Sequence, residues 1–310
     1  MKIPRLSFDS PRATMAIGLV GGMALLATIA PTVPPPDTPP SGVYRPNISG
    51  LKLPAKLDFC GEEIPLDNPE VRRRMEREFL LNLQSDGQIM LNLKRSGQYF
   101  PIYDSLLKAA GAPADLKFLS VAESALYQAQ SGKGAVGLWQ FIPETAQHYG
   151  LRVDSFVDER KDIVKSTAAA IRLLMDNRQR FGSWALSAAA YNMGEAATQD
   201  DLTFQNGHSF YDLFLNEETS RYVFRIIALK EIMTHPDRYG FFLNRSDYYA
   251  PTPATTVTVS DEITNLAQWA ESKGTTYKDV KLLNPWILKR NLPRPAGAPY
   301  AIAIPAKEGR

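Results

Sequence analysis

The stretch that decides the fold is LKFLSVAESALYQAQSGKGAVGLWQ, which occupies residues 116–140. It begins as an apolar helix, in which Glu123 follows Leu119 by four residues and Leu116 by seven. Helical spacing therefore places the Glu123 carboxyl group on the face that the two leucines bury. A segment of small residues, 131–137, comes next. The pattern favours an acid presented from the hydrophobic side of a helix, although a glutamate at a helix end can also turn to solvent or cap a neighbour.

The composition of the whole chain is that of a folded protein with room for one to three domains. Of its 310 residues, 44% are hydrophobic and 22% are charged, and the formal net charge is +2. This balance gives no support for a nucleic-acid partner, which requires a concentrated basic face. The single cysteine, Cys60, rules out an internal disulfide, and the three histidines have no ligand spacing. We therefore predict no metal and no cofactor.

The N-terminus has the pattern of an export signal. Lys2, Arg5 and Arg12 precede an apolar run, residues 13–30, and a proline-rich stretch follows. The run is also near the lower length limit of a membrane span, and Pro31 disfavours cleavage directly after Ala30. Residues 1–33 are thus either a signal peptide or a membrane anchor. Both interpretations predict an exported protein of the periplasm or cell envelope, with the inner or outer membrane as a partner in the anchored case.

The next part of the chain is predicted to be a linker followed by helices. Residues 34–66 are expected to form a proline-rich linker, and residues 67–97 N-terminal helices that begin at Asn68-Pro69. The first helix carries Val71, Met75, Phe79 and Leu83 at helical spacing. Two separate helices, 88–94 and 101–110, are expected next.

Residues 98–240 are predicted to form an all-helical domain, because no convincing strand occurs between residues 95 and 240. One long helix, 163–180, is expected to bury the stripe of Val164, Ala168, Ile171 and Met175. After Pro251-Thr252-Pro253 the pattern changes to strand, helix, helix and strand, at residues 255–260, 263–272, 277–283 and 300–304. Residues 252–310 are thus a small α+β module with βααβ order, and the chain as a whole is mainly α.

Four short blocks carry a family resemblance. In chain order they are Glu123-Ser124-Ala125, SGKGAVGLWQF at residues 131–141, VDER at residues 157–160 and AAYNMGE at residues 189–195. Together they resemble the lytic transglycosylases that cleave peptidoglycan (the SLT domain), closest to the membrane-bound lytic murein transglycosylase D type. The likeness covers about residues 98–240, and the C-terminal module resembles a LysM module, which binds peptidoglycan. The chain departs from the family pattern at Tyr127-Gln128 and at Ser260-Asp261-Glu262.

The resemblance implies a lysozyme-like catalytic domain that acts on peptidoglycan glycan strands. Members of this family use one glutamate, here Glu123, first as acid on the leaving oxygen and then as base on the 6-hydroxyl of the sugar. Such an acid must be protonated near neutral pH, and burial against apolar walls raises a carboxyl pKa in that direction. The product is a 1,6-anhydroMurNAc end, and the second block offers no further acid. The residues implied to bind substrate are Ser131, Gln140, Ile142, Tyr191, Asn192 and Tyr222.

Several of these residues also have purely structural interpretations. Ser131 can shape a turn, Gln140 can pack, and Tyr191 with Asn192 can end a helix. Tyr222 can be ordinary core. Three further features are interpreted as structural: Trp139 as core, Glu195, and the ion-pair loop Asp158-Glu159-Arg160. Two functional alternatives stay open, a lysozyme-like peptidoglycan hydrolase and a non-catalytic wall-binding protein.

Overall fold

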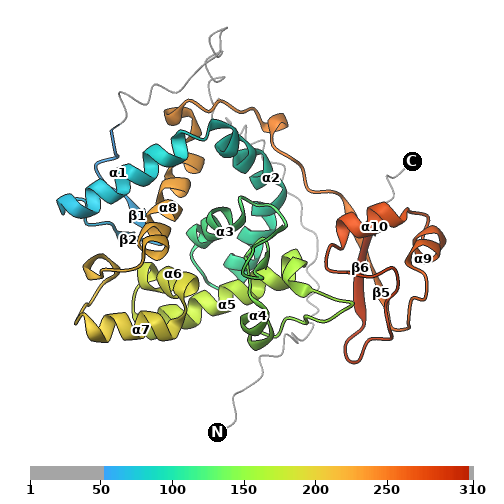
Figure 1. Cartoon of the computed structure of the whole chain (residues 1–310). Coiled ribbons are helices and arrows are strands. Elements are labelled where there is room, and N and C mark those ends of the chain that lie inside the picture. Colours follow the sequence, from blue (N-terminus) through green and yellow to red (C-terminus); the bar gives the residue numbers. More distant parts are fainter. Residues whose placement is uncertain (1–51, 307–310) are drawn as a thin grey trace, which may run out of the picture. The chain divides into compact units, whose positions relative to one another are not determined.

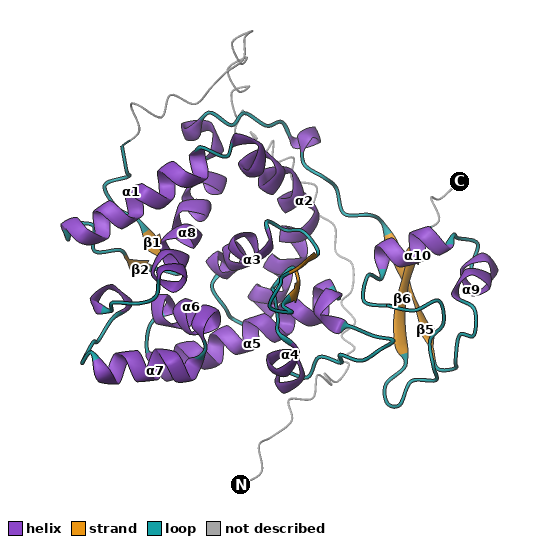
Figure 2. Cartoon of the chain, viewed as in Figure 1, coloured by secondary structure: helices purple, strands orange, loops and turns teal. Residues whose placement is uncertain are grey.

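A computed structural model describes residues 52–306, and Figure 1 shows their helices and strands along the chain. Helices dominate (Figure 2). They are α1 (Pro69–Leu83), α2 (Asp86–Ala109), α3 (Lys117–Ser124), α4 (Pro143–His148), α5 (Ile163–Phe181), α6 (Trp184–Met193), α7 (Glu195–Phe204), α8 (Glu217–Thr234), α9 (Leu266–Ser272) and α10 (Tyr277–Leu283). The strands form three antiparallel pairs, namely β1 (Asp58–Phe59) with β2 (Glu62–Glu63), β3 (Ala129–Gln130) with β4 (Val136–Gly137), and β5 (Ala254–Val259) with β6 (Tyr300–Pro305).

Two hydrophobic cores organise the described residues. The larger core is built by the helices before residue 240, and the smaller core lies in the module formed by β5, α9, α10 and β6. In the module, β5 and β6 pair along their whole length, with Val257 opposite Ile302. The predicted mainly α fold with a small α+β module is confirmed.

The first helix forms for the reasons that its sequence indicates. The Asn68 side chain accepts a hydrogen bond from the amide of Glu70 (2.9 Å) and caps α1, and Pro69 occupies the first helical position. The predicted apolar stripe is buried, since none of its four residues is more than 1% exposed. This stripe packs α1 against α8.

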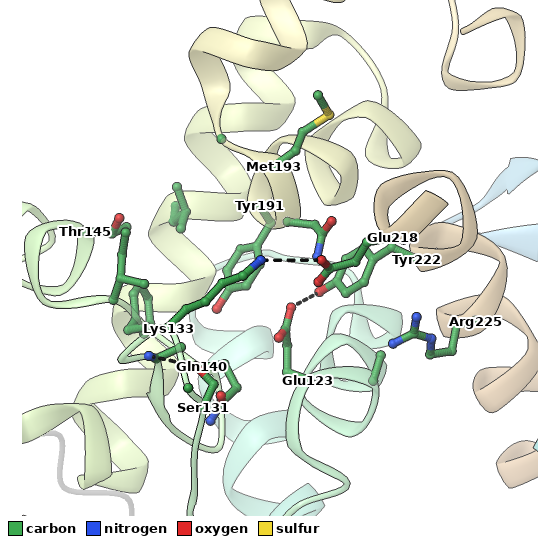
Figure 3. A pocket seen from close by; sticks show the side chains of 18 residues that line it. Glu123, Ser131, Lys133, Gln140, Thr145, Tyr191, Met193, Glu218, Tyr222 and Arg225 are labelled. Atoms are coloured by element: carbon green, nitrogen blue, oxygen red, sulfur yellow. Dashed lines mark hydrogen bonds and ion pairs between the residues drawn. The ribbon is translucent and has the colours of Figure 1, made fainter. Parts of the chain in front are cut away.

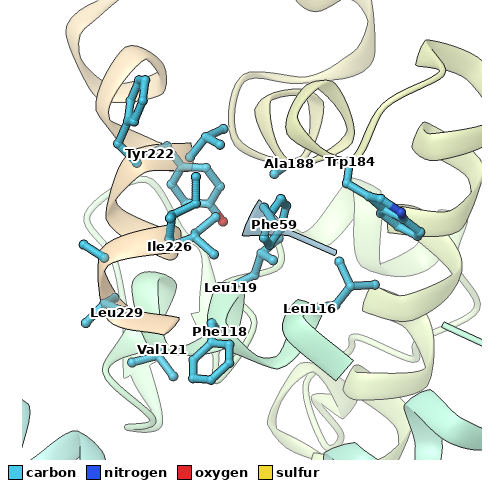
Figure 4. Packing of buried hydrophobic residues seen from close by; sticks show 14 of the residues in the cluster. Phe59, Leu116, Phe118, Leu119, Val121, Trp184, Ala188, Tyr222, Ile226 and Leu229 are labelled. Carbon is cyan, nitrogen blue, oxygen red and sulfur yellow. The ribbon is translucent and has the colours of Figure 1, made fainter. Parts of the chain in front are cut away.

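Helix α8 lies at the centre of the larger core and fixes the position of α3. It packs against α1, α3 and α6, and its buried residues include Tyr222 and Ile226. Leu116 and Leu119 are fully buried in the same core (Figure 4). The packing of α3 against α8 brings the end of α3, where Glu123 lies, to Tyr222.

The expected linker differs from the structure in its second half. Residues 57–66 were expected to be linker, yet Leu57, Phe59, Ile64 and Leu66 are buried in the larger core around the β1–β2 hairpin. The N-terminal helices belong to this same core and are not separate from the 98–240 region. The hairpin is also held by polar contacts, since the Cys60 amide donates to the Asp115 carboxylate (2.8 Å).

The predicted break between residues 94 and 101 is also wrong. A single helix, α2, passes through Gly97 and Pro101. Residues on both sides of the break, among them Leu93 and Tyr103, are buried in one core, so packing outweighs the local cost of the proline.

Two smaller expectations between residues 95 and 240 are wrong as well. The β3–β4 hairpin is a pair of short strands where none was expected. In α5 the stripe is shifted, because Val164 is 51% and Met175 36% exposed, whereas Ile171 and Leu174 are buried. The helix turns a different edge of its apolar surface to the core.

The interpretation of the N-terminus lies outside the described residues, since it concerns residues 1–33. From residue 52 to residue 306, no helix is both long enough and apolar enough to cross a membrane.

Candidate active site

All seven predicted site residues line one cleft in the helical region that forms the larger core (Figure 3). The cleft has a volume of about 670 Å³, and α3, the β3–β4 loop, α4, α6 and α8 contribute to it. The structure therefore brings together residues that are up to 99 positions apart in the sequence. They are Glu123, Ser131, Gln140, Ile142, Tyr191, Asn192 and Tyr222.

Glu123 is the acid at the centre of the cleft. The Tyr222 hydroxyl donates a hydrogen bond of 2.5 Å to its carboxylate. Burial raises the pKa of Glu123 to about 7, the hydrogen bond from Tyr222 and the charge of Arg225 oppose this rise, and the charge of Glu218 adds to it. A carboxyl group with this pKa is partly protonated at neutral pH, so it can both donate and accept a proton there.

The local backbone ends α3 at Ser124, one residue after Glu123. Ala125 and Leu126 both have positive φ, 52° and 55°, and the Ala125 amide donates to the Val121 carbonyl (2.8 Å) in a left-handed cap. The Ser124 hydroxyl donates to the Leu138 carbonyl oxygen (2.8 Å), which fixes the helix end to the loop that follows. The position of the acid is thus set by helix packing on one side and by this loop on the other.

The loop opposite Glu123 is held by two of the predicted substrate residues. The Ser131 hydroxyl accepts a hydrogen bond from the Ala135 amide (3.0 Å). The Gln140 side-chain nitrogen donates to the carbonyls of Ala129 (3.2 Å) and Gly137 (2.8 Å). Ser131 and Gln140 therefore shape the loop as well as line the cleft.

The end of α6 supplies the aromatic and amide residues. The Tyr191 hydroxyl donates to the Trp139 carbonyl oxygen (2.7 Å), and burial raises its pKa well above the ordinary value. The Asn192 side-chain oxygen Oδ1 accepts a hydrogen bond from the Thr219 hydroxyl (2.8 Å). Trp139 itself is fully buried and donates to the Thr167 hydroxyl (2.9 Å), which confirms its interpretation as core.

Ile142 and Tyr222 differ in exposure. Ile142 is 42% exposed and precedes Pro143 at the start of α4, where it forms an apolar part of the wall. Tyr222 is 2% exposed, so it is a core residue whose hydroxyl nevertheless reaches Glu123. The structural interpretation of Tyr222 as a core residue therefore holds, and its role in substrate binding stays a prediction.

Three charged residues of the cleft were not predicted. Lys133, Glu218 and Arg225 line it, and the Lys133 ammonium lies 3.9 Å from the Glu218 carboxylate (Figure 3). Glu218 lies in the first turn of α8, where acids are common for helix-dipole reasons alone. Arg225 follows Tyr222 by three residues, and this helical spacing was the one signal that could have identified it.

The charged residues interpreted as structural form ion pairs. Asp158 and Arg160 are joined at 2.8 Å and buried, and Arg180 binds Glu195 at 2.8 Å. Within residues 52–306, no three histidine, cysteine or acidic side chains gather in a metal-binding group.

Fold and site together define a mainly helical domain with one partly buried glutamate in its cleft. Residues 103–213 match the family described as "Transglycosylase SLT domain". Residues 255–308 match "Soluble lytic transglycosylase C-terminal LysM-like domain". The chain thus contains an SLT transglycosylase domain and a LysM-like C-terminal domain, and the predicted resemblance is confirmed.

The chain is similar to membrane-bound lytic murein transglycosylase D of Escherichia coli (strain K12). The two are 30% identical over 257 residues, which cover 80% of this chain and 55% of the relative. The chain thus spans about half the length of this curated relative.

Two solved structures overlap the chain in part. The lytic transglycosylase Slt of Pseudomonas aeruginosa is 21% identical, with 49% of this chain and 26% of that chain covered and a TM-score of 0.38. The 70 kDa soluble lytic transglycosylase of Escherichia coli is 22% identical, with 48% of this chain and 27% of that chain covered and a TM-score of 0.37.

Proposed function

We propose that this protein is a peptidoglycan lytic transglycosylase. It cleaves the MurNAc-β-1,4-GlcNAc bond without water and leaves 1,6-anhydroMurNAc ends. The observation that carries the proposal is Glu123, whose pKa is raised to about 7 in a cleft where the Tyr222 hydroxyl contacts its carboxylate. The family membership supports the same reaction.

Glu123 serves as both acid and base in this reaction. In its protonated form it gives its proton to the leaving glycosidic oxygen, which departs as a hydroxyl. As a carboxylate it then takes the proton of the sugar's 6-hydroxyl, whose oxygen bonds to the anomeric carbon and closes the anhydro ring. A pKa near the working pH suits both steps, because neither protonation state is costly to reach.

The other cleft residues hold the sugar chain in this proposal. Tyr191 and Asn192 lie on the α6 side, and Ser131, Gln140 and Ile142 lie on the side of the β3–β4 loop and α4. Tyr222 orients the Glu123 carboxyl group and opposes the rise of its pKa through its hydrogen bond. The LysM-like module, residues 252–310, supplies further affinity for glycan strands.

We further propose that the protein works in the cell envelope. The apolar run at residues 13–30 acts as an export signal or as an anchor to a membrane. The relative in Escherichia coli is called membrane-bound, which is in keeping with the anchored form.

Product analysis tests the proposed reaction. Purified sacculi are digested with the full chain, and the muropeptides are separated and weighed by mass spectrometry. We expect ends that are lighter than reducing ends by one water. Reducing ends as the main product would contradict the proposal.

The Glu123→Gln variant tests the catalytic residue in the same assay. We expect turnover to fall at least about a thousandfold, because acid and base catalysis each contribute roughly 10²–10⁴-fold. Sacculus binding should stay close to that of the unchanged protein. The matched control is Glu195→Gln, which removes an acid paired with Arg180 outside the cleft lining. Substantial residual turnover in Glu123→Gln would contradict the assignment of Glu123, whereas a lack of turnover in the unchanged protein would favour the non-catalytic wall-binding alternative.

A second candidate function rests on Glu218. A lysozyme-like hydrolase needs a second carboxylate to activate water or to act as nucleophile, and Glu218 is a second carboxylate in the lining of the cleft. Its side chain is 64% exposed and pairs with Lys133, which is a poor setting for a base. In the transglycosylase proposal, Glu218→Gln therefore keeps most turnover and still yields anhydro ends. Loss of turnover in this variant, with reducing ends from the unchanged protein, would favour the hydrolase.

A further inference from the structure

The loop between α4 and α5 takes part in both hydrophobic cores. Val153 packs against the larger core. Val157 is 1% exposed and belongs to the core of the C-terminal module, together with Ile263, Leu266 and Ile287. The loop between α4 and α5 thus contributes a side chain to the interior of the module.

Backbone pairing joins the same loop to the module. Val157 forms an antiparallel bridge with Ile287. The Asp158 amide donates to the Trp286 carbonyl (2.9 Å), and the Leu288 amide donates to the Phe156 carbonyl (2.8 Å). Residues 156–158 and 286–288 therefore pair as short strands do, which fixes their register as well as their contact.

The next residues of the loop reach the cleft. Arg160 and Asp158 form two parallel hydrogen bonds, each of 2.8 Å, and are 7% and 5% exposed. The remaining arm of the guanidinium donates to the carbonyls of Gly134 (2.9 Å) and Phe141 (3.1 Å). Phe141 lines the cleft, and Gly134 lies in the loop between β3 and β4.

Gly137 allows this loop to lie directly on Arg160. A Cβ atom added at Gly137 would stand 2.1 Å from the Arg160 carbonyl oxygen, and the residue has a φ of +89°. The Gln128 side chain adds a hydrogen bond to the Lys161 carbonyl (3.0 Å). Residues 158–161 therefore pack against the cleft loop, residues 129–141, and support it.

We propose that the C-terminal module is a positioning partner of the cleft: its pairing with residues 156–158 holds Asp158 and Arg160, and Arg160 in turn holds the cleft loop. Arg160 is a positioning residue in this scheme, since it acts through the carbonyls of Gly134 and Phe141. The effect on catalysis rests on the proposed function, whereas the effect on loop order does not. Release of the module is expected to loosen the loop that carries Ser131 and Gln140.

Hydrogen exchange in the full chain measures loop order directly. The reporters are the amides of Ser131, Ala135 and Val136, which bond to Ala135 O, Ser131 Oγ and Phe141 O within the cleft loop. The test variant is Val157→Asp, which puts a carboxylate into the apolar core of the module. The matched control is Val164→Asp, the same substitution at an exposed position of α5.

We expect exchange at the reporters to rise about tenfold in Val157→Asp and to stay unchanged in Val164→Asp. Amides of α8 should keep their protection in both variants. If the Asp158 and Leu288 amides lose protection while the reporters do not, the module does not order the loop and the proposal is overturned. Protection of Asp158 and Leu288 that survives the substitution overturns it equally, because Val157 then does not hold the pairing. If Val157→Asp unfolds the module, the pairing of residues 156–158 with 286–288 is also lost. Exchange at the reporter amides must therefore rise in that case too.

Substitution of Arg160 tests the second step of the proposal, in which Arg160 holds the cleft loop, and it leaves the module unchanged. Arg160→Gln should loosen the reporters as Val157→Asp does, and Arg160→Lys should restore only part of their protection, because an ammonium cannot form the two-pronged contact with Asp158. The Asp158 and Leu288 amides should stay protected in both. In steady-state assays on a soluble glycan fragment, a loosened loop should raise KM several-fold with a smaller fall in kcat. Reporters that stay protected in Arg160→Gln would overturn the role of Arg160, and this result is independent of whether the protein is a transglycosylase.

Discussion

At the scale of single residues, the proton affinity of Glu123 is a balance between its burial and its neighbours. Burial is the largest influence and raises the pKa, and the Tyr222 hydrogen bond is the largest opposing one. Arg225 lowers the pKa and Glu218 raises it. Burial therefore sets the direction of the pKa shift, and three side chains of α8 adjust its size.

Tyr222→Phe should shift the pH dependence of catalysis. The hydroxyl stabilises the ionised form of Glu123, so its loss raises the pKa above about 7. Because Glu123 must carry a proton to start the reaction, activity falls as pH rises through this pKa. We expect the alkaline limb of the kcat/KM profile to move upward by up to about one pH unit, the size of one hydrogen bond to a charged group.

The matched control for this measurement is Tyr103→Phe. Tyr103 is also a fully buried tyrosine, but its hydroxyl bonds to Ser120. The alkaline limb should stay in place in this variant. A limb that moves downward in Tyr222→Phe, or equally in both variants, would contradict the account of Tyr222.

Glu123 should also make the protein less stable as pH rises. The pKa is raised from 4.5 to about 7 on folding, so the folded state binds more protons between these values, and the free energy of unfolding falls as pH rises through this window. Glu123→Gln removes the ionisable group, and with it this loss of stability. The variant should gain stability over the unchanged protein between pH 4.5 and pH 7, by up to about 3 kcal/mol at 1.36 kcal/mol for each pKa unit.

Urea unfolding of both proteins at several pH values measures this difference. The stability gained by Glu123→Gln over the unchanged protein should be constant below pH 4.5 and above about pH 8, and it should rise between these values. A difference that does not depend on pH would mean that Glu123 is not buried enough to have a raised pKa.

At the scale of elements, those with a regular apolar stripe and clear end signals were predictable, and those held by distant contacts were not. Helix α1 shows the first case, with Asn68, Pro69 and a four-residue stripe. Helix α2 shows the second, since its Gly97 and Pro101 predict a break that the core overrides. The β3–β4 hairpin was missed because its strands have only two residues each, too few for an alternating pattern.

Gly97 in α2 marks a close contact that no local rule predicts. A Cβ atom there would lie 2.7 Å from the Tyr248 Cβ and 2.8 Å from the Tyr249 carbonyl oxygen. The Tyr249 amide bonds to the Lys94 carbonyl (2.8 Å), so this backbone is fixed against the helix. Gly97→Ala should therefore lower the free energy of unfolding by about 1–3 kcal/mol, as overpacking does.

Gly87→Ala is the control in the same helix. A Cβ atom there has no neighbour within 4 Å, and alanine is the better helix former by about 1 kcal/mol. We expect a neutral or stabilising effect in thermal unfolding. Equal losses in both variants would mean that the contact of α2 with Tyr248 and Tyr249 is not tight.

At the scale of the whole molecule, the order of motifs predicted the family and the cleft, and tertiary packing decided the rest. Glu123 and Tyr191 could be named because each lies in a recognisable block, and Tyr222 could be named through the family resemblance. Glu218 and Lys133 could not, since they are 85 residues apart and become neighbours only when α8 packs beside the cleft loop. The same limit applies to Val157, whose place in the core of the module depends on residues more than 100 positions later.

The central claim is that one glutamate cleaves the glycan and lets the sugar's own 6-hydroxyl, rather than water, close the reaction. Digestion of sacculi in water enriched in oxygen-18 tests this directly. We predict that the new muramoyl ends carry no label and are lighter than reducing ends by one water. New ends that carry one labelled oxygen would contradict the account, because water would then have attacked the anomeric carbon.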